Sequence, residues 1–137
     1  MDEIFSPIEM NDEYRVGIEA IDREHLYLIA LYNGLVDAVR EGNARDMWDD
    51  AIQKLVAYAD YHFANEERLM TARQFPGYDK HRRQHDNFVQ NISRLVAERA
   101  NCDEENALKL LLVFVGQWIR GHILITDKEL GEFIGHE

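Results

Sequence analysis

Apolar residues recur at spacings of three and four along four stretches of the chain, which is the period of an amphipathic helix. The stretches cover residues 18–39, 47–70, 78–96 and 108–130. Each is long enough for several helical turns and carries polar residues on the opposite face. The pattern therefore predicts four long helices, each with one side turned toward a shared core.

Three short connections separate the four stretches. Gly42 suits the C-terminal end of the first helix, because glycine adopts the left-handed conformation found there, and Asn43 is expected to cap the second helix. The segment 74–77 contains a proline, which cannot continue a helix. Residues 101–103 form the last connection, with Asp103 as the expected N-cap. Long helices with short connections are antiparallel neighbours, so the predicted fold class is all-α, an up-down-up-down four-helix bundle.

The segments outside the periodic pattern are short. Residues 1–17 are expected to form an extended N-terminal arm along the bundle, and residues 18–133 the bundle itself. A chain of 137 residues suits one compact domain and is long enough to enclose a core. We therefore expect a single domain over residues 1–137.

Composition and charge narrow the range of partners. The chain is 46% hydrophobic and 30% charged, as in soluble globular proteins, and its net charge of -11 argues against binding nucleic acid. The opening MDEIFSP lacks the basic and apolar regions of a signal peptide. The most apolar stretch, from Leu110, is interrupted by Gln117 and closed by Arg120, which makes it too short to cross a bilayer. We therefore expect a cytoplasmic protein without a membrane partner. Cys102 is the single cysteine, so the chain can form neither an intramolecular disulfide nor a zinc site with several thiolate ligands.

Five of the six histidines fall within the apolar stripes. They are His25, His62, His81, His85 and His122. Every predicted helix carries at least one of them, and in an up-down-up-down bundle all five belong to the same end. His136 lies beyond Gly135, outside the stripes, and is expected to have no role.

A metal site explains this clustering better than core packing does. A single inward histidine is more often a hydrogen-bonded core residue, but here Glu66 also occupies a stripe, four residues after His62. A buried carboxylate and several unpartnered imidazoles are costly unless a cation satisfies them. Nitrogen and oxygen ligands suit iron, zinc, copper or manganese. Five histidines exceed the needs of one zinc ion, so two metals that share carboxylates is the simpler interpretation.

A two-metal site needs a second carboxylate. Asp127 is the best candidate, but it follows His122 by five residues, which is about 140° around a regular helix. The two side chains share a face only if the helix widens locally or Asp127 reaches toward a metal between them. Glu24, Asp60 and Glu67 are the alternatives, and each is otherwise interpreted as a solvated residue.

These residues resemble the hemerythrin family, and in particular its single-domain bacterial branch. The similarity covers nearly the whole chain, through VGIEAIDREHLYL, HFANEE, YDKHRRQH and WIRGHILITD, and the elements His, His-x3-Glu, His-x3-His and His-x4-Asp occur in order. Two departures are Met10, where bacterial members usually have tryptophan, and Ile119, where a leucine is common. The resemblance implies two non-haem iron ions per chain, joined by an oxo or hydroxo bridge. It assigns His25 and His62 to one iron, His81, His85 and His122 to the other, and Glu66 and Asp127 as bridges.

The function that the resemblance implies is reversible O₂ binding, for storage, delivery or scavenging, without catalytic residues. The ligand count leaves one position open on the two-histidine iron. The expected apolar residues around O₂ are Leu28, Phe63, Trp118, Ile119 and Ile123. One alternative is a di-iron enzyme with peroxidase activity or an activity that detoxifies NO or peroxide. Another is an O₂ or redox sensor that acts through a separate, unknown protein partner. Carboxylate-rich di-iron proteins use Glu-x-x-His motifs, and this sequence has none, which favours O₂ binding.

Overall fold

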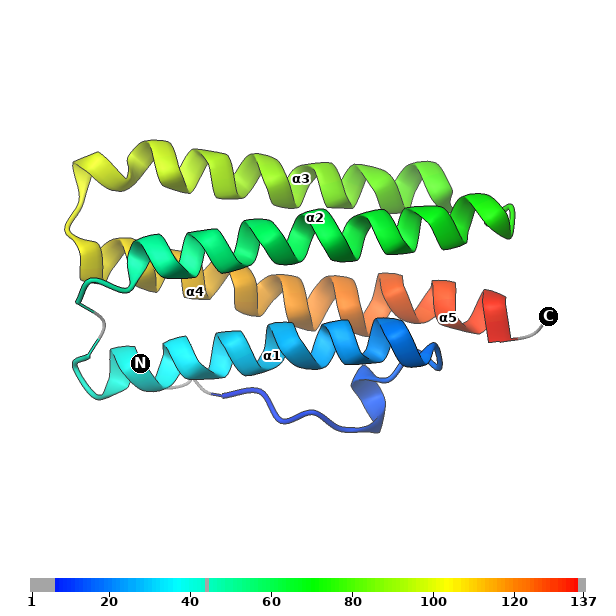
Figure 1. The fold of residues 1–137 in the computed structure, drawn as a ribbon, viewed down its shortest axis with the longest axis horizontal. Helices are drawn as coiled ribbons and strands as arrows, with labels where there is room; N and C mark the ends of the chain where they lie inside the picture. Colours follow the sequence, from blue (N-terminus) through cyan, green and yellow to red (C-terminus); the bar gives the residue numbers. More distant parts are fainter. Residues whose placement is uncertain (1–6, 44, 136–137) are drawn as a thin grey trace.

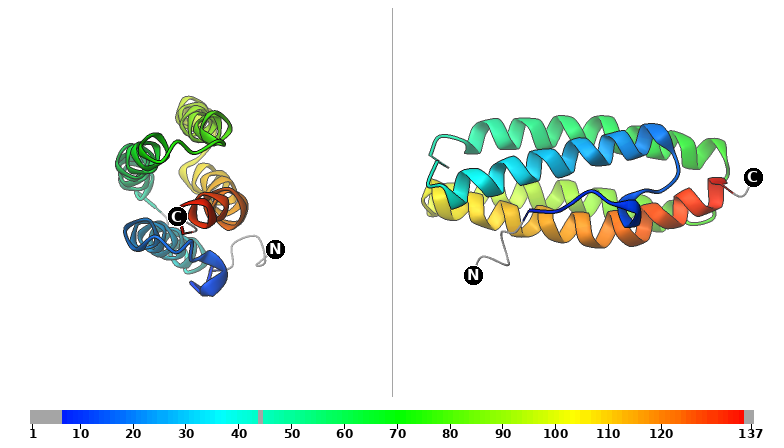
Figure 2. Two further views of the ribbon diagram at one scale, coloured as in Figure 1. Left: turned by 90° about the vertical axis from the view of Figure 1, so that its right-hand side faces the viewer. Right: turned by 90° about the horizontal axis from the view of Figure 1, so that it is seen from below.

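Four helical rods pack side by side around a common centre (Figures 1 and 2). The computed structural model describes residues 7–43 and 45–135. The helices are α1 (Glu19–Arg40), α2 (Trp48–Ala72), α3 (Tyr78–Glu98), and a fourth rod made of α4 (Glu104–Trp118), the π-helical segment η3 (Ile119–Asp127) and α5 (Lys128–Gly135). Two 3₁₀ turns, η1 (Asp12–Tyr14) and η2 (Arg99–Asn101), complete the described elements. The predicted all-α four-helix bundle is confirmed, while His136 and the first six residues of the arm lie outside the described residues.

The core follows the apolar stripes. In α1, for example, Leu28, Tyr32 and Val36 are fully buried at four-residue intervals. Leu108, Leu111 and Leu112 of α4 are buried in the same cluster. Side chains at these spacings lie on one face of a helix, so each rod turns its apolar side toward the others.

The connection between α1 and α2 differs from the prediction at its second helix. Asn43 does not cap α2, which begins five residues later at Trp48 and has no side-chain cap at Met47. The backbone N–H of Trp48 instead donates to Glu104 Oε1 at the start of α4 (3.1 Å). A tertiary contact thus replaces the local cap. The predicted cap of α4 is confirmed, because the Asp103 side chain accepts a hydrogen bond from the backbone N–H of Asn106 (2.8 Å).

The described part of the arm, residues 7–17, packs along the bundle (Figure 2). The Asn33 side chain holds Ile8 by accepting from its backbone N–H (2.7 Å) and donating to its carbonyl (2.8 Å). A Cβ atom added at Gly131 would lie 2.0 Å from the carbonyl oxygen of Val16, so the arm approaches α5 at a point where only glycine fits. The 3₁₀ turn η1 interrupts this arm. The sequence led us to expect an extended arm, but the arm is not extended at these three residues.

The fourth rod is longer than its apolar stretch suggested. Among the described residues, the continuous helix Glu104–Gly135 is long and apolar enough, by length and composition, to cross a membrane. Half of its most apolar 18-residue segment is buried inside the bundle. The apolar residues on that side are therefore core residues of the four-helix bundle.

Candidate metal centre

Seven polar side chains are buried together inside the bundle. None is more than 4% exposed. They are His25 from α1, His62 and Glu66 from α2, His81 and His85 from α3, and His122 and Asp127 from η3. The structure thus brings together, from all four rods, the five histidines, Glu66 and Asp127, whereas the alternatives Glu24, Asp60 and Glu67 are not in this buried set.

The seven side chains form two overlapping groups that could each hold a metal ion. One group contains Glu66, His81, His85, His122 and Asp127. The other contains His25, His62, Glu66 and Asp127. Within each group the candidate ligand atoms lie within 4.8 Å of one another. Glu66 and Asp127 belong to both groups, which is the arrangement that two neighbouring metals with shared carboxylates require.

Glu66 lies at the centre of three imidazoles. Its Oε1 atom is 3.2 Å from His62 Nε2, 3.1 Å from His85 Nε2 and 3.5 Å from His81 Nε2. His62 precedes Glu66 by four residues, so regular α-helical geometry aims both side chains inward. Glu66 therefore connects α2 to both imidazoles of α3.

Asp127 occupies the corresponding position on the fourth rod. Its Oδ2 atom is 2.8 Å from His25 Nε2, and its Oδ1 atom is 2.9 Å from the Nε2 atoms of both His81 and His122. His122 and Asp127 lie in the π-helical segment η3. A π-helix has hydrogen bonds between residues five apart and is wider than an α-helix. This local widening, one of the two possibilities left open by the sequence, places residues five apart on the same face.

The outer nitrogens of three histidines have polar partners of their own. His62 Nδ1 lies 2.5 Å from Glu24 Oε1, and His85 Nδ1 lies 3.0 Å from Glu67 Oε2. His122 Nδ1 lies 2.7 Å from Gln84 Oε1. If the carboxylate or amide oxygen accepts the Nδ1 proton, Nε2, which points into the centre, is the nitrogen that would coordinate a metal.

Sequence reasoning missed these orienting contacts. It considered Glu24 and Glu67 only as alternative ligands or solvated residues, and it did not consider Gln84. Each partner is 18 or 38 residues away from its histidine in the sequence, so no local pattern signals the pair. Asp60, the remaining alternative, is exposed.

The charges of the site favour a cation at its centre. Burial alone would lower the pKa of His62, but the Glu66 charge and the hydrogen bonds with Glu24 and Glu66 raise it to about 10. Burial likewise opposes the charge on His81, but Asp127 and Glu66 raise its pKa to about 9. The pKa of Asp127 is held well below its usual value, against burial, by His122, His25 and His81. Protons on imidazoles thus balance the carboxylates in the metal-free protein.

Several inward atoms still lack hydrogen bonds of acceptable geometry within the described residues. They are Nε2 of His25, His62, His81 and His122, Oε2 of Glu66, and both carboxylate oxygens of Asp127. Buried polar atoms without partners cost free energy, which coordination to a metal would recover. Nitrogen and oxygen donors in this number fit two metal ions of the iron or zinc type.

Of the five residues expected around O₂, three lie in the apolar core and two stack on histidine rings. Leu28, Ile119 and Ile123 are fully buried in the core cluster. Phe63 stacks on His85, with ring centroids 3.9 Å apart, and the partly buried Trp118 stacks on His122 at 4.0 Å. The two aromatic rings therefore lie against the three-histidine group.

Comparisons with known proteins agree with this geometry. The profile of the Hemerythrin HHE cation binding domain matches residues 16–134. The chain is 30% identical over 121 residues to a bacteriohemerythrin of Clostridium acetobutylicum, which covers 86% of this chain and 94% of that protein. It is also similar to a bacteriohemerythrin of Pseudomonas aeruginosa, at 30% identity over 91% of this chain and 80% of the relative. A myohemerythrin of Theromyzon tessulatum is 26% identical over 91% of this chain and 92% of its own length.

Proposed function

This chain belongs to the hemerythrin family, and from that premise we propose that it binds O₂ reversibly at a non-haem di-iron centre. One observation carries the proposal: two groups of buried nitrogen and oxygen donors overlap on a pair of carboxylates. When bound, the two iron ions supply the electrons and the coordination position on which reversible O₂ binding depends. The chain supplies the ligands, their orientation and the exclusion of water.

We assign the ligands according to the two groups. His25 and His62 would hold one iron, and the three remaining buried histidines, His81, His85 and His122, would hold the other. Glu66 and Asp127 would bridge the two ions. The short contacts of each carboxylate with histidines from both groups support this assignment.

The apolar residues around the centre would keep the O₂-bound form intact. Leu28, Ile119 and Ile123 are fully buried and carry no proton that can be transferred. Excluding water from such a pocket lowers the local dielectric and removes the usual source of protons. We therefore propose binding without turnover, in preference to peroxidase activity or detoxification of NO or peroxide.

The partners follow from this proposal. O₂ is the proposed ligand, and the net charge of -11 disfavours nucleic acid as a partner. We propose that the protein acts in the cytoplasm.

An anaerobic titration with O₂ tests the proposal. The protein is prepared with iron, and the two donor groups predict about two ions per chain. It is then reduced with dithionite and titrated with O₂ while its absorption spectrum is followed. The expected spectrum appears with O₂ and disappears under vacuum. One zinc ion per chain would contradict the metal assignment. Consumption of O₂ in proportion to added reductant, with no recovery under vacuum, would favour an enzyme.

A further inference from the structure

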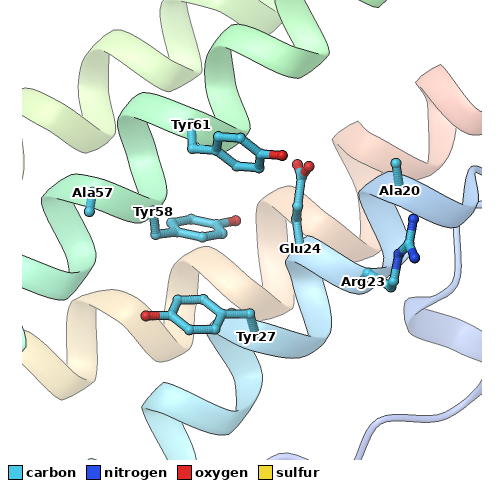
Figure 3. Close-up of a pocket in the computed structure, with 7 residues that line it drawn as sticks. All are labelled: Ala20, Arg23, Glu24, Tyr27, Ala57, Tyr58 and Tyr61. Atoms are coloured by element: carbon cyan, nitrogen blue, oxygen red, sulfur yellow. The ribbon is translucent and has the colours of Figure 1, made fainter.

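A surface cavity between α1 and α2 approaches the metal centre from outside. Its volume is about 460 Å³. Its lining combines three tyrosines, Tyr27, Tyr58 and Tyr61, with two alanines, Arg23 and Glu24 (Figure 3). This cavity is separate from the seven buried metal-ligand candidates, none of which lines it.

Two residues of the cavity wall contact His62 directly. The Glu24 carboxylate lies 2.5 Å from His62 Nδ1, and the Tyr58 ring stacks on the His62 imidazole with centroids 5.0 Å apart and planes 17° apart. His62 itself is only 1% exposed. The cavity therefore brings solvent-accessible space within one residue of the two-histidine group.

The cavity is lined by one buried and two exposed tyrosines. Tyr58 is 5% exposed, and its hydroxyl has no hydrogen-bond partner within the described residues. Tyr27 from α1 and Tyr61 from α2 are 50% and 66% exposed, and Figure 3 shows the Tyr58 ring between theirs.

We propose that this cavity binds a neutral aromatic hydroquinone, which returns the metal centre to the reduced state that binds O₂. This inference rests on the proposed O₂-binding function. Tyrosine rings stack favourably on a flat aromatic ring, and the exposed rings of Tyr27 and Tyr61 are available for such stacking. The Glu24 oxygens already contact His62 and Asn65. The net charge of -11 disfavours anionic donors.

The redox step balances with this class of donor. A hydroquinone becomes a quinone by losing two electrons and two protons. The two electrons pass through Tyr58 and His62 and convert two ferric ions to ferrous ions. The two protons leave to bulk water at the mouth of the cavity, between the exposed Tyr27 and Tyr61.

Binding is tested first on the metal-free protein. The probe is tetramethyl-1,4-benzoquinone, whose fully substituted ring does not add to the Cys102 thiol, and binding is measured by equilibrium dialysis. We expect saturable binding, weakened about tenfold by Tyr61→Ala through loss of ring stacking. Ala57→Trp should abolish binding by filling the cavity, while Ala97→Trp, at an exposed alanine of α3, should bind like the parent protein. The proposal would be overturned if the parent protein showed no saturable binding, or if Ala57→Trp bound the quinone as tightly as the parent protein.

Electron delivery is tested next on the diferric protein. With tetramethylhydroquinone, the rate of reduction should saturate with donor concentration and fall about tenfold or more in Ala57→Trp, in line with the lost affinity. With dithionite, both proteins should be reduced at the same rate. Equal hydroquinone rates in both proteins, or no reduction of the parent, would overturn the donor role. The donor role would also be overturned by a third result. In that result, reduced flavin mononucleotide, which is anionic, reduces the parent protein faster than tetramethylhydroquinone does, and Ala57→Trp slows both reactions by the same factor.

The two proposals can fail separately. If dithionite-reduced protein binds no O₂, the proposed function fails, whatever the quinone does. If the reduced protein binds O₂ but the metal-free protein binds no quinone, only the assignment of the cavity fails.

Discussion

Two adjacent glutamates have different roles at the scale of the residue. Glu66 is fully buried among three histidines, whereas Glu67 has a side chain 28% exposed and contacts the outer nitrogen of His85. Glu66→Gln should lower iron content to one ion per chain or less, because an amide does not bridge two cations. Glu67→Gln should retain two ions but bind them about 10- to 100-fold more weakly, as expected for an orienting partner. Elemental analysis and competition with a chelator measure both effects, and equal loss in the two variants would contradict these roles.

Ile119 is the residue on which the lifetime of the O₂-bound form is expected to depend. It is fully buried one turn before His122, and side chains on a helix lean toward the preceding turn. Ile119→Ala should accelerate loss of the O₂-bound spectrum by admitting water, with iron still bound. Leu111→Ala is the matched control, since both substitutions remove a fully buried side chain and cost about 2–5 kcal/mol of stability. Equal rates of autoxidation would mean that Ile119 only fills the core.

At the scale of the element, the π-helical segment η3 is the part of the fold that metal should stabilise most. It holds two of the seven candidate ligands, His122 and Asp127, in a π-helical geometry that is rare in proteins and frequent at functional sites. Coordination would tie His122 and Asp127 to the other three rods. Amides 123–128 should therefore exchange about tenfold or more slowly with metal than without it. Hydrogen-exchange mass spectrometry measures this, with residues 107–115 of α4 as the internal reference; an equal change in both segments would argue against a local effect.

The contact between α5 and the arm is a second feature at this scale. Gly131→Ala would place a Cβ atom 2.0 Å from the Val16 carbonyl oxygen, so the arm or the helix must move. We expect a loss of about 1–3 kcal/mol, as for overpacked sites. Gly34→Ala is the control, because no heavy atom lies within 4 Å of its Cβ position and alanine favours a helix by about 0.5–1 kcal/mol. Urea denaturation of the metal-free proteins gives both values, and a stable Gly131→Ala would mean that the arm is not docked.

At the scale of the whole molecule, metal binding, protonation and stability are coupled. The pKa values of about 10 for His62 and about 9 for His81 exceed the unfolded value near 6.5. Their stabilising contribution to the metal-free fold is therefore complete below that value and is lost as pH rises through 9–10. Metal requires both imidazoles without these protons, so loading with ferrous iron at pH 7.5 should release about two protons from them, and affinity should fall as pH falls. An indicator dye under anaerobic conditions measures the release, and a release of none would contradict the protonation described.

The sequence by itself determined the four rods, their order and most of the centre. A period of 3.6 residues assigns each side chain to a helix face, and antiparallel packing places the histidines at one end. His62 with Glu66, and His81 with His85, follow directly because residues four apart share a face. The predicted Asp103 cap was also local, since it depends on backbone groups three residues away.

Only the tertiary structure decided the features that depend on residues far apart in the chain. Regular helical geometry could not place Asp127 beside His122, and the π-helical segment became evident only in the packed fourth rod. The cap of α2 comes from Glu104, 56 residues away, which is why the local expectation for Asn43 was wrong. Glu24, Glu67 and Gln84 reach their histidines across helix interfaces. Helix periodicity fixes the direction of a side chain but not which residue of another helix it meets; that depends on how the rods pack.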